Sequence, residues 1–301
     1  MVSRLEAAGL VPHLAHPLAV KQRIAGSTRT DGTDAAGLAM LLGSGTLPEV
    51  CMASPAVRDL RGLVRGRLAL RRLQSSCKHR VHGVLNQYGL KNQIEEEDEV
   101  DIHDWFTNQA QRHLLRAIDG LPPATREATR QHWMIVRDLE MRIKSLELAM
   151  EARTGRLGWL RMLQTMPGVG KILGATIWVE IGDVRRFGSA QQLARYAGLV
   201  PPVQSSGGKT CRGSTSKDGN HYLKWAFVEA ANVVVGRQQK GEEKYPHVVG
   251  LYRRVKATTK LSGKAKVAVA RHLAEAAWWI LTRKQVYREP TSARVTSSHS
   301  G

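Results

Sequence analysis

Two long stretches of the chain carry apolar residues at helical spacing. In the first, apolar residues recur every seven positions among arginines and lysines: Leu63, Leu70, Cys77 and Val84. In the second, apolar residues step by three and four positions: Val136, Leu139, Ile143, Leu146 and Met150. Such spacing is typical of the seam of a coiled coil or of an antiparallel helix pair. The two stretches predict a helical arm over residues 57–157 that joins two globular parts and pairs protomers.

Within this arm, residues 95–104 are strongly acidic (EEEDEVDIHD), and Pro122 and Pro123 follow them. The second long helix is expected to follow this acidic run and the proline-containing segment LPPATRE. The acidic run reads as a solvated linker between the two helices.

The segment before the arm predicts short elements. Residues 10–17 (LVPHLAHP) favour a short strand, and residues 19–24 favour a helix. The run DAAGLAMLLGSG predicts a second helix with Asp34 near its start and a Gly-Ser-Gly stop.

After the arm, the pattern is again helical. One helix is expected over residues 171–182, and a second is capped by Ser189 and ended by Gly198. Further helices are expected to begin near Asn220 and to run from Ser262 to about Lys284. The fold class is therefore mainly α, with a disordered tail over residues 289–301.

The net charge of the chain limits the classes of partner that it is expected to bind. The sequence has 45 Lys and Arg against 26 Asp and Glu, which gives a net charge of +19. Such an excess favours a polyanionic partner, because each neutralised phosphate releases counterions. The three cysteines have no metal-type spacing, and no apolar run reaches membrane-spanning length. These features fit a cytoplasmic protein that associates with the nucleoid.

Asp31 and Asp34 are the first candidates for chemistry. If the helix extends back to Asp31, the two carboxylates share one face. Their hard oxygen atoms could then hold a magnesium ion. The alternative is that Asp34 caps the helix and Asp31 lies in a turn.

A glycine turn, Pro167-Gly168-Val169-Gly170, precedes the helix that starts at Lys171. Such a turn can direct the backbone N–H groups of a helix start at a phosphate, as in a helix-hairpin-helix contact with DNA. A plain glycine turn between core helices fits the sequence about equally well.

A second glycine-rich segment carries Ser205 and Ser206 before Gly207-Gly208. A serine hydroxyl needs assistance to act as a nucleophile, and no histidine or carboxylate lies beside Ser206 in the sequence. Four cationic or imidazole residues follow it and could clamp a phosphate and stabilise developing charge: Lys209, Arg212, Lys217 and His221. Ser-Gly-Gly is also a common flexible turn. Residues that bind DNA phosphates position the DNA but do not recognise its base sequence.

One combined run of the sequence resembles the C-terminal domain of the insertion-sequence-110 family of transposases: PGVG…EIGDVRRFGSAQQLARYAGLVPP…SSGGK…RGSTSKDGN. Upstream, TDGTDAAGLAMLLGSGTLPEV is similar to the end of that family's RuvC-like (RNase H-like) domain. The two regions lie in the family's order with the helical arm between them, so the resemblance covers nearly the whole chain.

The resemblance implies a recombinase with a two-part active site. A RuvC-like half holds Mg²⁺ through four carboxylates, of which Asp31 and Asp34 match the third and fourth. The C-terminal half supplies a serine that attacks a DNA phosphate, and the family spacing places that nucleophile at Ser206 rather than Ser205. The implied partners are DNA, at the element ends and the target, a structured guide RNA, and further copies of the chain in a dimer or tetramer.

The family's first aspartate and its glutamate have no counterpart in this sequence, since Glu6 falls too late. We therefore expect residues 1–56 to be the C-terminal remnant of a RuvC-like domain, in a shortened copy or one read from an internal start. Residues 158–288 form the expected transposase domain. Catalysis by this chain is expected to be impaired, because two isolated aspartates hold magnesium weakly.

Two other functions fit the residues. A non-catalytic nucleic-acid-binding protein would use the glycine turn and the basic helices alone, with the aspartates as caps and Ser206 as a turn residue. A structure-specific nuclease or repair factor would cleave DNA without a serine–DNA bond.

Overall fold

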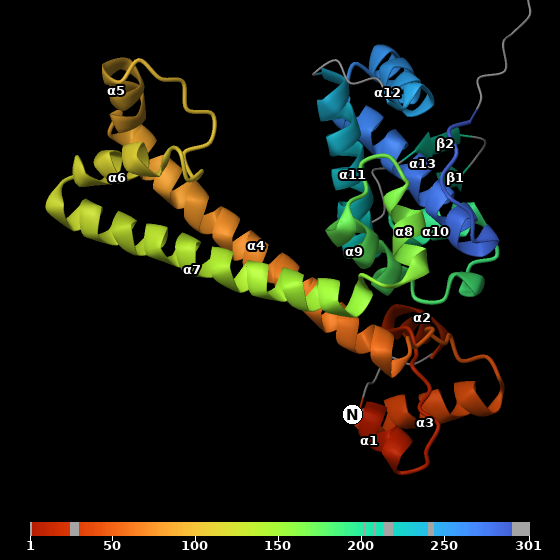
Figure 1. The fold of residues 1–301 in the computed structure, drawn as a ribbon. Coiled ribbons are helices and arrows are strands. Elements are labelled where there is room, and N and C mark those ends of the chain that lie inside the picture. The colour runs from red at the N-terminus through yellow and green to blue at the C-terminus, as the bar shows by residue number, and fades with distance from the viewer. Residues whose placement is uncertain are drawn as a thin grey trace, which may run out of the picture. The chain divides into compact units, whose positions relative to one another are not determined.

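Helices make up most of the protein in a computed structural model (Figure 1). The structure describes residues 2–24, 30–200, 203–206, 209–212, 219–239 and 244–290. The expected mainly α fold is confirmed for these residues. The chain divides into two units, Met1–Pro55 and Ala56–Gly301.

The first unit contains three helices: α1 (Val2–Ala7), α2 (Pro17–Arg23) and α3 (Asp31–Gly43). Helix α3 begins at Asp31, so both aspartates lie in its first turn. Thr30 caps this helix and forms a capping box with Thr33, so the alternative of a cap by Asp34 is wrong. The strand expected over residues 10–17 is also wrong, because only Ala15 makes a bridge, to Glu49.

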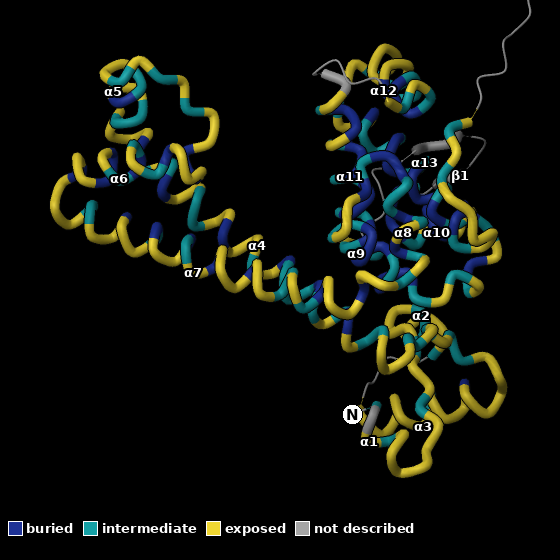
Figure 2. Tube along the Cα trace, in the orientation of Figure 1, coloured by how far each residue is buried: buried dark blue, intermediate teal, exposed yellow. Residues whose placement is uncertain are grey.

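The first unit buries little apolar surface. Leu41 is its only buried hydrophobic residue among the described residues. Several large apolar side chains are exposed instead, and Leu18, Leu38 and Leu42 line a groove of about 720 Å³. Figure 2 shows this unit mostly exposed. The RuvC-like remnant stays a prediction, because the described residues of this unit form no sheet beyond the single bridge.

In the second unit, α4 (Pro55–Gln87) and α7 (Pro123–Thr154) form an antiparallel helix pair, the arm (Figure 1). Arg67 Nε and Nη2 lie 2.9 and 2.6 Å from Glu147 Oε1. Nearer the far end, the amide of Gln74 donates to the carbonyl oxygen of Val136 at 3.2 Å. The predicted helix pair is therefore formed within one chain.

The buried face of α4 differs from the predicted seam. The seven-residue series from Leu63 to Val84 is only half-buried. The buried positions lie beside that series: Leu60, Val64, Leu68, Gln74, Val81 and Leu85. The prediction missed them because a buried glutamine, which is satisfied by a backbone carbonyl, interrupts the apolar spacing. On α7 the prediction holds better, since Val136, Leu139, Ile143 and Met150 are buried.

The expectation of a solvated linker over residues 95–104 holds only in part, because these residues are exposed or half-buried but the first of them are helical. The first part of this acidic segment belongs to α5 (Leu90–Glu97), which packs against α6 (Gln111–Asp119). Arg116 binds Glu97 and Asp98, the latter at 2.7 Å. Ile102, Trp105 and Phe106 then pack into the hydrophobic cluster at this end of the arm.

The C-terminal part of the second unit is a helical bundle with a small hairpin. Its elements are α8 (Gly158–Gln164), α9 (Lys171–Ile181), η1 (Val184–Arg186), α10 (Ala190–Tyr196), β1 (Val203–Ser206), β2 (Lys209–Arg212), α11 (His221–Gln239), α12 (Pro246–Thr259) and α13 (Ser262–Arg283). The predicted helices at Lys171, Ser189, Asn220 and Ser262 are confirmed. Ser189 accepts from the backbone N–H of Gln192, as a capping serine should.

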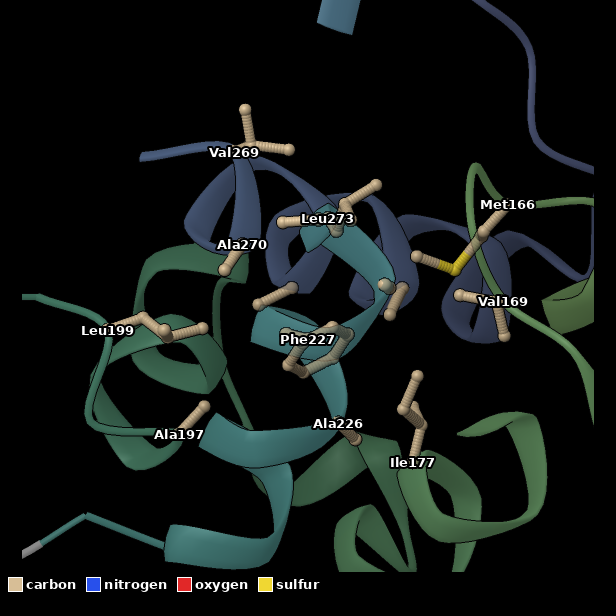
Figure 3. Close-up of a cluster of buried hydrophobic side chains, with 14 of the residues drawn as sticks. Met166, Val169, Ile177, Ala197, Leu199, Ala226, Phe227, Val269, Ala270 and Leu273 are labelled. Carbon is tan, nitrogen blue, oxygen red and sulfur yellow. The ribbon is translucent and has the colours of Figure 1, made fainter. Parts of the chain in front are cut away.

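Phe227 on α11 lies at the centre of the core of this bundle (Figure 3). Leu273 of α13, Ile177 of α9 and Leu199 surround it, and all four are almost fully buried. Alanines fill the face between α11 and α13: Ala226, Ala230, Ala270, Ala274 and Ala277. Such small residues let the two helices approach closely, and the resulting core fixes the ends of the hairpin.

Helix α12 was not predicted, although Pro246 stands at its first turn. Glu289 completes its start: Oε1 accepts from the backbone N–H groups of His247 and Val248 at 2.7 and 3.3 Å. Residue 289, the first of the expected tail, is thus bound to the bundle, and residues 291–301 lie outside the described residues.

Candidate functional site

The hairpin that carries Ser206 connects α10 to α11. Strands β1 and β2 are antiparallel, and their register pairs Ser206 with Lys209 and Ser205 with Thr210. Arg212 pairs with Val203 at the other end. The structure describes these strands through their backbone, and Lys217 lies outside the described residues.

The chain segments that flank the hairpin meet at one point, the hairpin base. Gly198 has a φ of +67°, which glycine adopts without strain. A Cβ atom on Gly219 would lie 2.4 Å from the Cα atom of Gly198, so only glycine fits there. The N–H of Asn220 donates to the carbonyl oxygen of Tyr196 at 2.7 Å. The base of the hairpin is therefore closed by direct backbone contact.

Asn220 uses both ends of its side-chain amide. Its Oδ1 accepts from the N–H groups of Tyr222 and Leu223 at 3.0 and 3.1 Å, which caps α11. Its Nδ2 donates to Glu180 Oε2 at 2.9 Å and lies 3.4 Å from the hydroxyl of Tyr196. One residue thus joins the start of α11, the hairpin base and α9.

Glu180 on α9 is a fully buried carboxylate with cationic partners from the arm. Arg65 of α4 binds it through two parallel hydrogen bonds of 2.8 and 2.9 Å, and Arg61 Nε lies 3.7 Å away. Burial favours the protonated acid, but the hydrogen bonds from Arg65 and Asn220 outweigh it and hold the pKa of Glu180 below its usual range. Glu180 is therefore a charged acceptor at neutral pH.

Arg65 also lies over the ring of Tyr222, 4.6 Å from its centroid. Arg61 donates from Nε and Nη2 to the carbonyl oxygen of Val179 near the end of α9. A cation at the C-terminal end of a helix is favourable, because the last carbonyls carry partial negative charge. These contacts attach α4 to both α9 and α11.

The glycine turn before α9 has a structural role at one of its glycines. Gly168 has a φ of +73°, and an added Cβ atom would lie 2.1 Å from the carbonyl oxygen of Ala230. Gly170 is exposed with open space around it, and Lys171 forms an ion pair with Glu151 of α7. The predicted DNA contact of this turn remains a prediction.

Asp31 and Asp34 both lie exposed in the first turn of α3, three residues apart. Their oxygen atoms suit magnesium, and the spacing allows both to reach one ion. No group of three or more metal-ligating side chains occurs anywhere in the described part of the chain. The pair therefore fits as part of a magnesium site and does not complete one.

Sequence reasoning missed a basic groove of about 710 Å³ between α4 and α11. Arginines and a histidine of α4 line one side, and Trp225 and Glu229 of α11 line the other; the α4 residues are Arg67, Arg71, Arg72, His79 and Arg80. It also missed Arg65 and Glu180, which are 115 residues apart in the sequence. The run of arginines on α4 was the available signal, but the sequence does not say which helix faces it.

His221, the first residue of α11, is exposed, with its ring 4.1 Å from that of Tyr222. The hairpin thus places Lys209 opposite Ser206, whereas Arg212 lies at the other end of β2, opposite Val203, and His221 follows the hairpin base. The aspartates belong to the other unit.

Residues 160–246, from α8 through the hairpin to α11, match a family model described as Transposase IS116/IS110/IS902 family. The chain carries a transposase domain of the IS116/IS110/IS902 family. The resemblance inferred from the sequence motifs is confirmed, and the hairpin with Ser206 lies inside the matched transposase domain.

Similar proteins extend the likeness beyond the transposase domain. A probable family 20 transposase of Pseudomonas aeruginosa is 26% identical over 286 residues, which cover 93% of this chain and 80% of that protein. The transposase for insertion sequence element IS1111A of Coxiella burnetii is 23% identical over 280 residues, or 93% of this chain and 74% of that protein. An uncharacterized 43.6 kDa protein of insertion element IS110 from Streptomyces coelicolor is 40% identical over 70 residues, 23% of this chain and 17% of that protein.

None of the helices that the structure describes is long and apolar enough to cross a membrane.

Proposed function

We propose that this chain is a DNA transposase that cuts and rejoins DNA through Ser206, with Mg²⁺ held in part by Asp31 and Asp34. The observation that carries the proposal is the register of the hairpin. Ser206 stands at the end of β1 opposite Lys209, whereas Ser205 stands opposite Thr210. Of the two serines, Ser206 alone has a cation as its cross-strand neighbour, which supports it over Ser205 as the nucleophile.

The reaction expected at Ser206 is the attack of its hydroxyl oxygen on a DNA phosphorus. The hydroxyl loses its proton as the serine–phosphate bond forms, and the sugar oxygen leaves and takes up a proton, so the step is balanced. Attack of a sugar hydroxyl of a new strand on the serine–phosphate reverses this step, returns the proton to the serine and rejoins the DNA. Lys209 and Arg212 would neutralise the negative charge that develops on the phosphate. Lys217 and His221 would hold the phosphate backbone of the DNA. Mg²⁺, when bound, would polarise a phosphate oxygen.

The groove between α4 and α11 supports a nucleic-acid partner. Its arginines gather on one helix face, and the whole chain has a net charge of +19. Arginine pairs with phosphate oxygens through two parallel hydrogen bonds, and it can do so with DNA or RNA. The guide RNA itself rests on the family resemblance. A nucleic-acid partner of this kind fits a cytoplasmic protein at the nucleoid.

The outer face of α7 supports assembly into a homo-oligomer. Met134, Met141 and Leu148 recur every seven residues and are 57%, 67% and 60% exposed. An exposed apolar stripe with this period is typical of a coiled-coil seam, which supports the pairing of two arms through this face. The arm would then bring two transposase domains together as a dimer or as part of a tetramer.

Covalent trapping tests the role of Ser206. The chain is incubated with DNA of the element ends and Mg²⁺, denatured, and run on a gel that separates protein–DNA adducts. Ser206→Ala should abolish the adduct while DNA binding stays nearly intact. Ser205→Ala, the neighbouring serine, should leave the adduct unchanged. Persistence of the adduct in Ser206→Ala would remove that residue from the mechanism.

A second candidate function is a non-catalytic nucleic-acid-binding protein. The described residues contain no group of three metal-ligating side chains, and the first unit buries only Leu41 among its described hydrophobic residues. A chain that binds DNA or RNA through its basic helices but forms no adduct or joined product would fit this function.

A further inference from the structure

The closed base of the hairpin and the arm meet at Glu180. The carboxylate accepts from Arg65 of α4 on one side and from Asn220 at the hairpin base on the other. Its side chain is completely buried, so solvent cannot replace either partner. We propose that Glu180 is a positioning residue that couples helix α4 of the arm to the base of the Ser206 hairpin through Arg65 and Asn220.

The chemistry of this cluster leaves Glu180 no substitute. Arg65 and Asn220 direct three N–H donors at its two oxygen atoms within 2.9 Å. A carboxylate has two acceptor oxygen atoms and no donor. An amide at this position would place its own NH₂ group against the N–H donors of Arg65 and Asn220. Loss of the carboxylate would leave buried donors unpaired and would therefore weaken the contacts that link the arm to the hairpin.

The backbone shows why such a contact would reach the hairpin. Asn220 is held by Tyr196 through its N–H, and Gly198 touches Gly219 one residue before it. The chain enters and leaves the hairpin segment at this contact, so a shift of Asn220 moves both flanks of that segment together. The arm, which carries the basic groove and the apolar stripe, therefore reaches the hairpin base through this carboxylate, in addition to the contacts of Arg65 with Tyr222 and of Arg61 with Val179. Any consequence for Ser206 rests on the proposed function, whereas the coupling itself does not.

Two isosteric variants isolate the contact. Glu180→Gln keeps the volume and places a donor against Arg65 and Asn220. Asn220→Asp keeps the Oδ1 cap of α11 but places a carboxylate within 2.9 Å of Glu180. The double variant E180Q/N220D reverses the direction of the hydrogen bond between the two side chains and should recover part of the contact. The control is Glu147→Gln, which weakens the ion pair with Arg67 inside the arm and touches nothing at the hairpin.

The measurement is made on the full chain without DNA. A nitroxide label on Cys211 of β2, in a C51S/C77S background, reports the mobility of the hairpin by electron paramagnetic resonance. Hydrogen exchange reports the backbone N–H of Asn220. In Glu180→Gln and Asn220→Asp we expect the label to be more mobile than in the parent. We also expect the backbone N–H of Asn220 to exchange about tenfold faster, because each variant loses a hydrogen bond to a charged group. The control should match the parent, and E180Q/N220D should lie between.

Two results would overturn the proposal. In the first, the label and the Asn220 exchange in the single variants match those of Glu147→Gln. In the second, exchange rises equally at the Phe227 amide in the core, which means general destabilisation. The adduct assay, run in parallel, separates the two proposals. If the label responds but the parent forms no adduct, the coupling stands and the proposed function fails. If both hold, the adduct yield should fall in Glu180→Gln.

Discussion

Gly168→Ala tests whether the glycine turn is shaped by packing. Gly168 has a φ of +73°, and an alanine there costs about 1–2 kcal/mol from the backbone conformation alone. The new Cβ atom would also lie 2.1 Å from the carbonyl oxygen of Ala230 and 2.9 Å from its carbonyl carbon. These are backbone atoms of α11, which cannot rotate away, so overpacking adds about 1–3 kcal/mol. We expect the free energy of unfolding to fall by about 2–5 kcal/mol.

The neighbouring glycine supplies the control. Gly170 has a φ of −95°, and an added Cβ atom would have nothing within 4 Å. Glycine is a better N-cap residue than alanine, so this change should lower the stability by about 0.5–1 kcal/mol, well below the loss expected at Gly168. If the turn binds a phosphate, Gly170→Ala should weaken DNA binding without unfolding the domain. The pair therefore separates packing from DNA contact within one turn.

The assay is urea unfolding followed by tryptophan fluorescence and circular dichroism, with DNA affinity measured on each folded variant. A loss below about 1 kcal/mol in Gly168→Ala would refute the packing argument, because either contribution alone predicts at least that much. Unchanged DNA affinity in Gly170→Ala would contradict the helix-hairpin-helix contact.

Two further predictions follow from the structure. Burial and the nearby His247 lower the pKa of His272, so this imidazole binds a proton less readily in the folded protein than in the unfolded chain. The free energy of unfolding should therefore fall as the pH drops below about 6.5, by at most about 1.4 kcal/mol per pH unit, and His272→Gln should flatten that slope in urea titrations. For the apolar stripe, the triple variant Met134→Lys, Met141→Lys and Leu148→Lys should lower the mass measured by light scattering while circular dichroism stays unchanged; an unchanged mass would exclude this face as the seam.

Local signals explain which elements could be predicted from the sequence. Ser189 as a cap, Gly198 as a stop and Pro123 at a helix start act within one turn, and the structure has each of them. The acidic segment was read as a linker throughout, because its charge gives no sign that Ile102 and the neighbouring Trp105 and Phe106 pack into a cluster with residues of α4 and α6. The spacing of apolar residues identifies the buried face of a helix only where every buried position is apolar. On α4 one of the buried positions is Gln74, so the spacing there is misleading.

The sequence by itself determined the helices, the basic character and the transposase motifs around Ser206, because these depend on neighbouring residues and on composition. The tertiary structure alone decided that Arg65 reaches Glu180 across 115 positions of the chain, and that Asn220 joins this pair to the base of the hairpin. The physical reason is that a buried charge takes its partner from whichever element packs against it, and packing is set by the whole core rather than by any local run of residues.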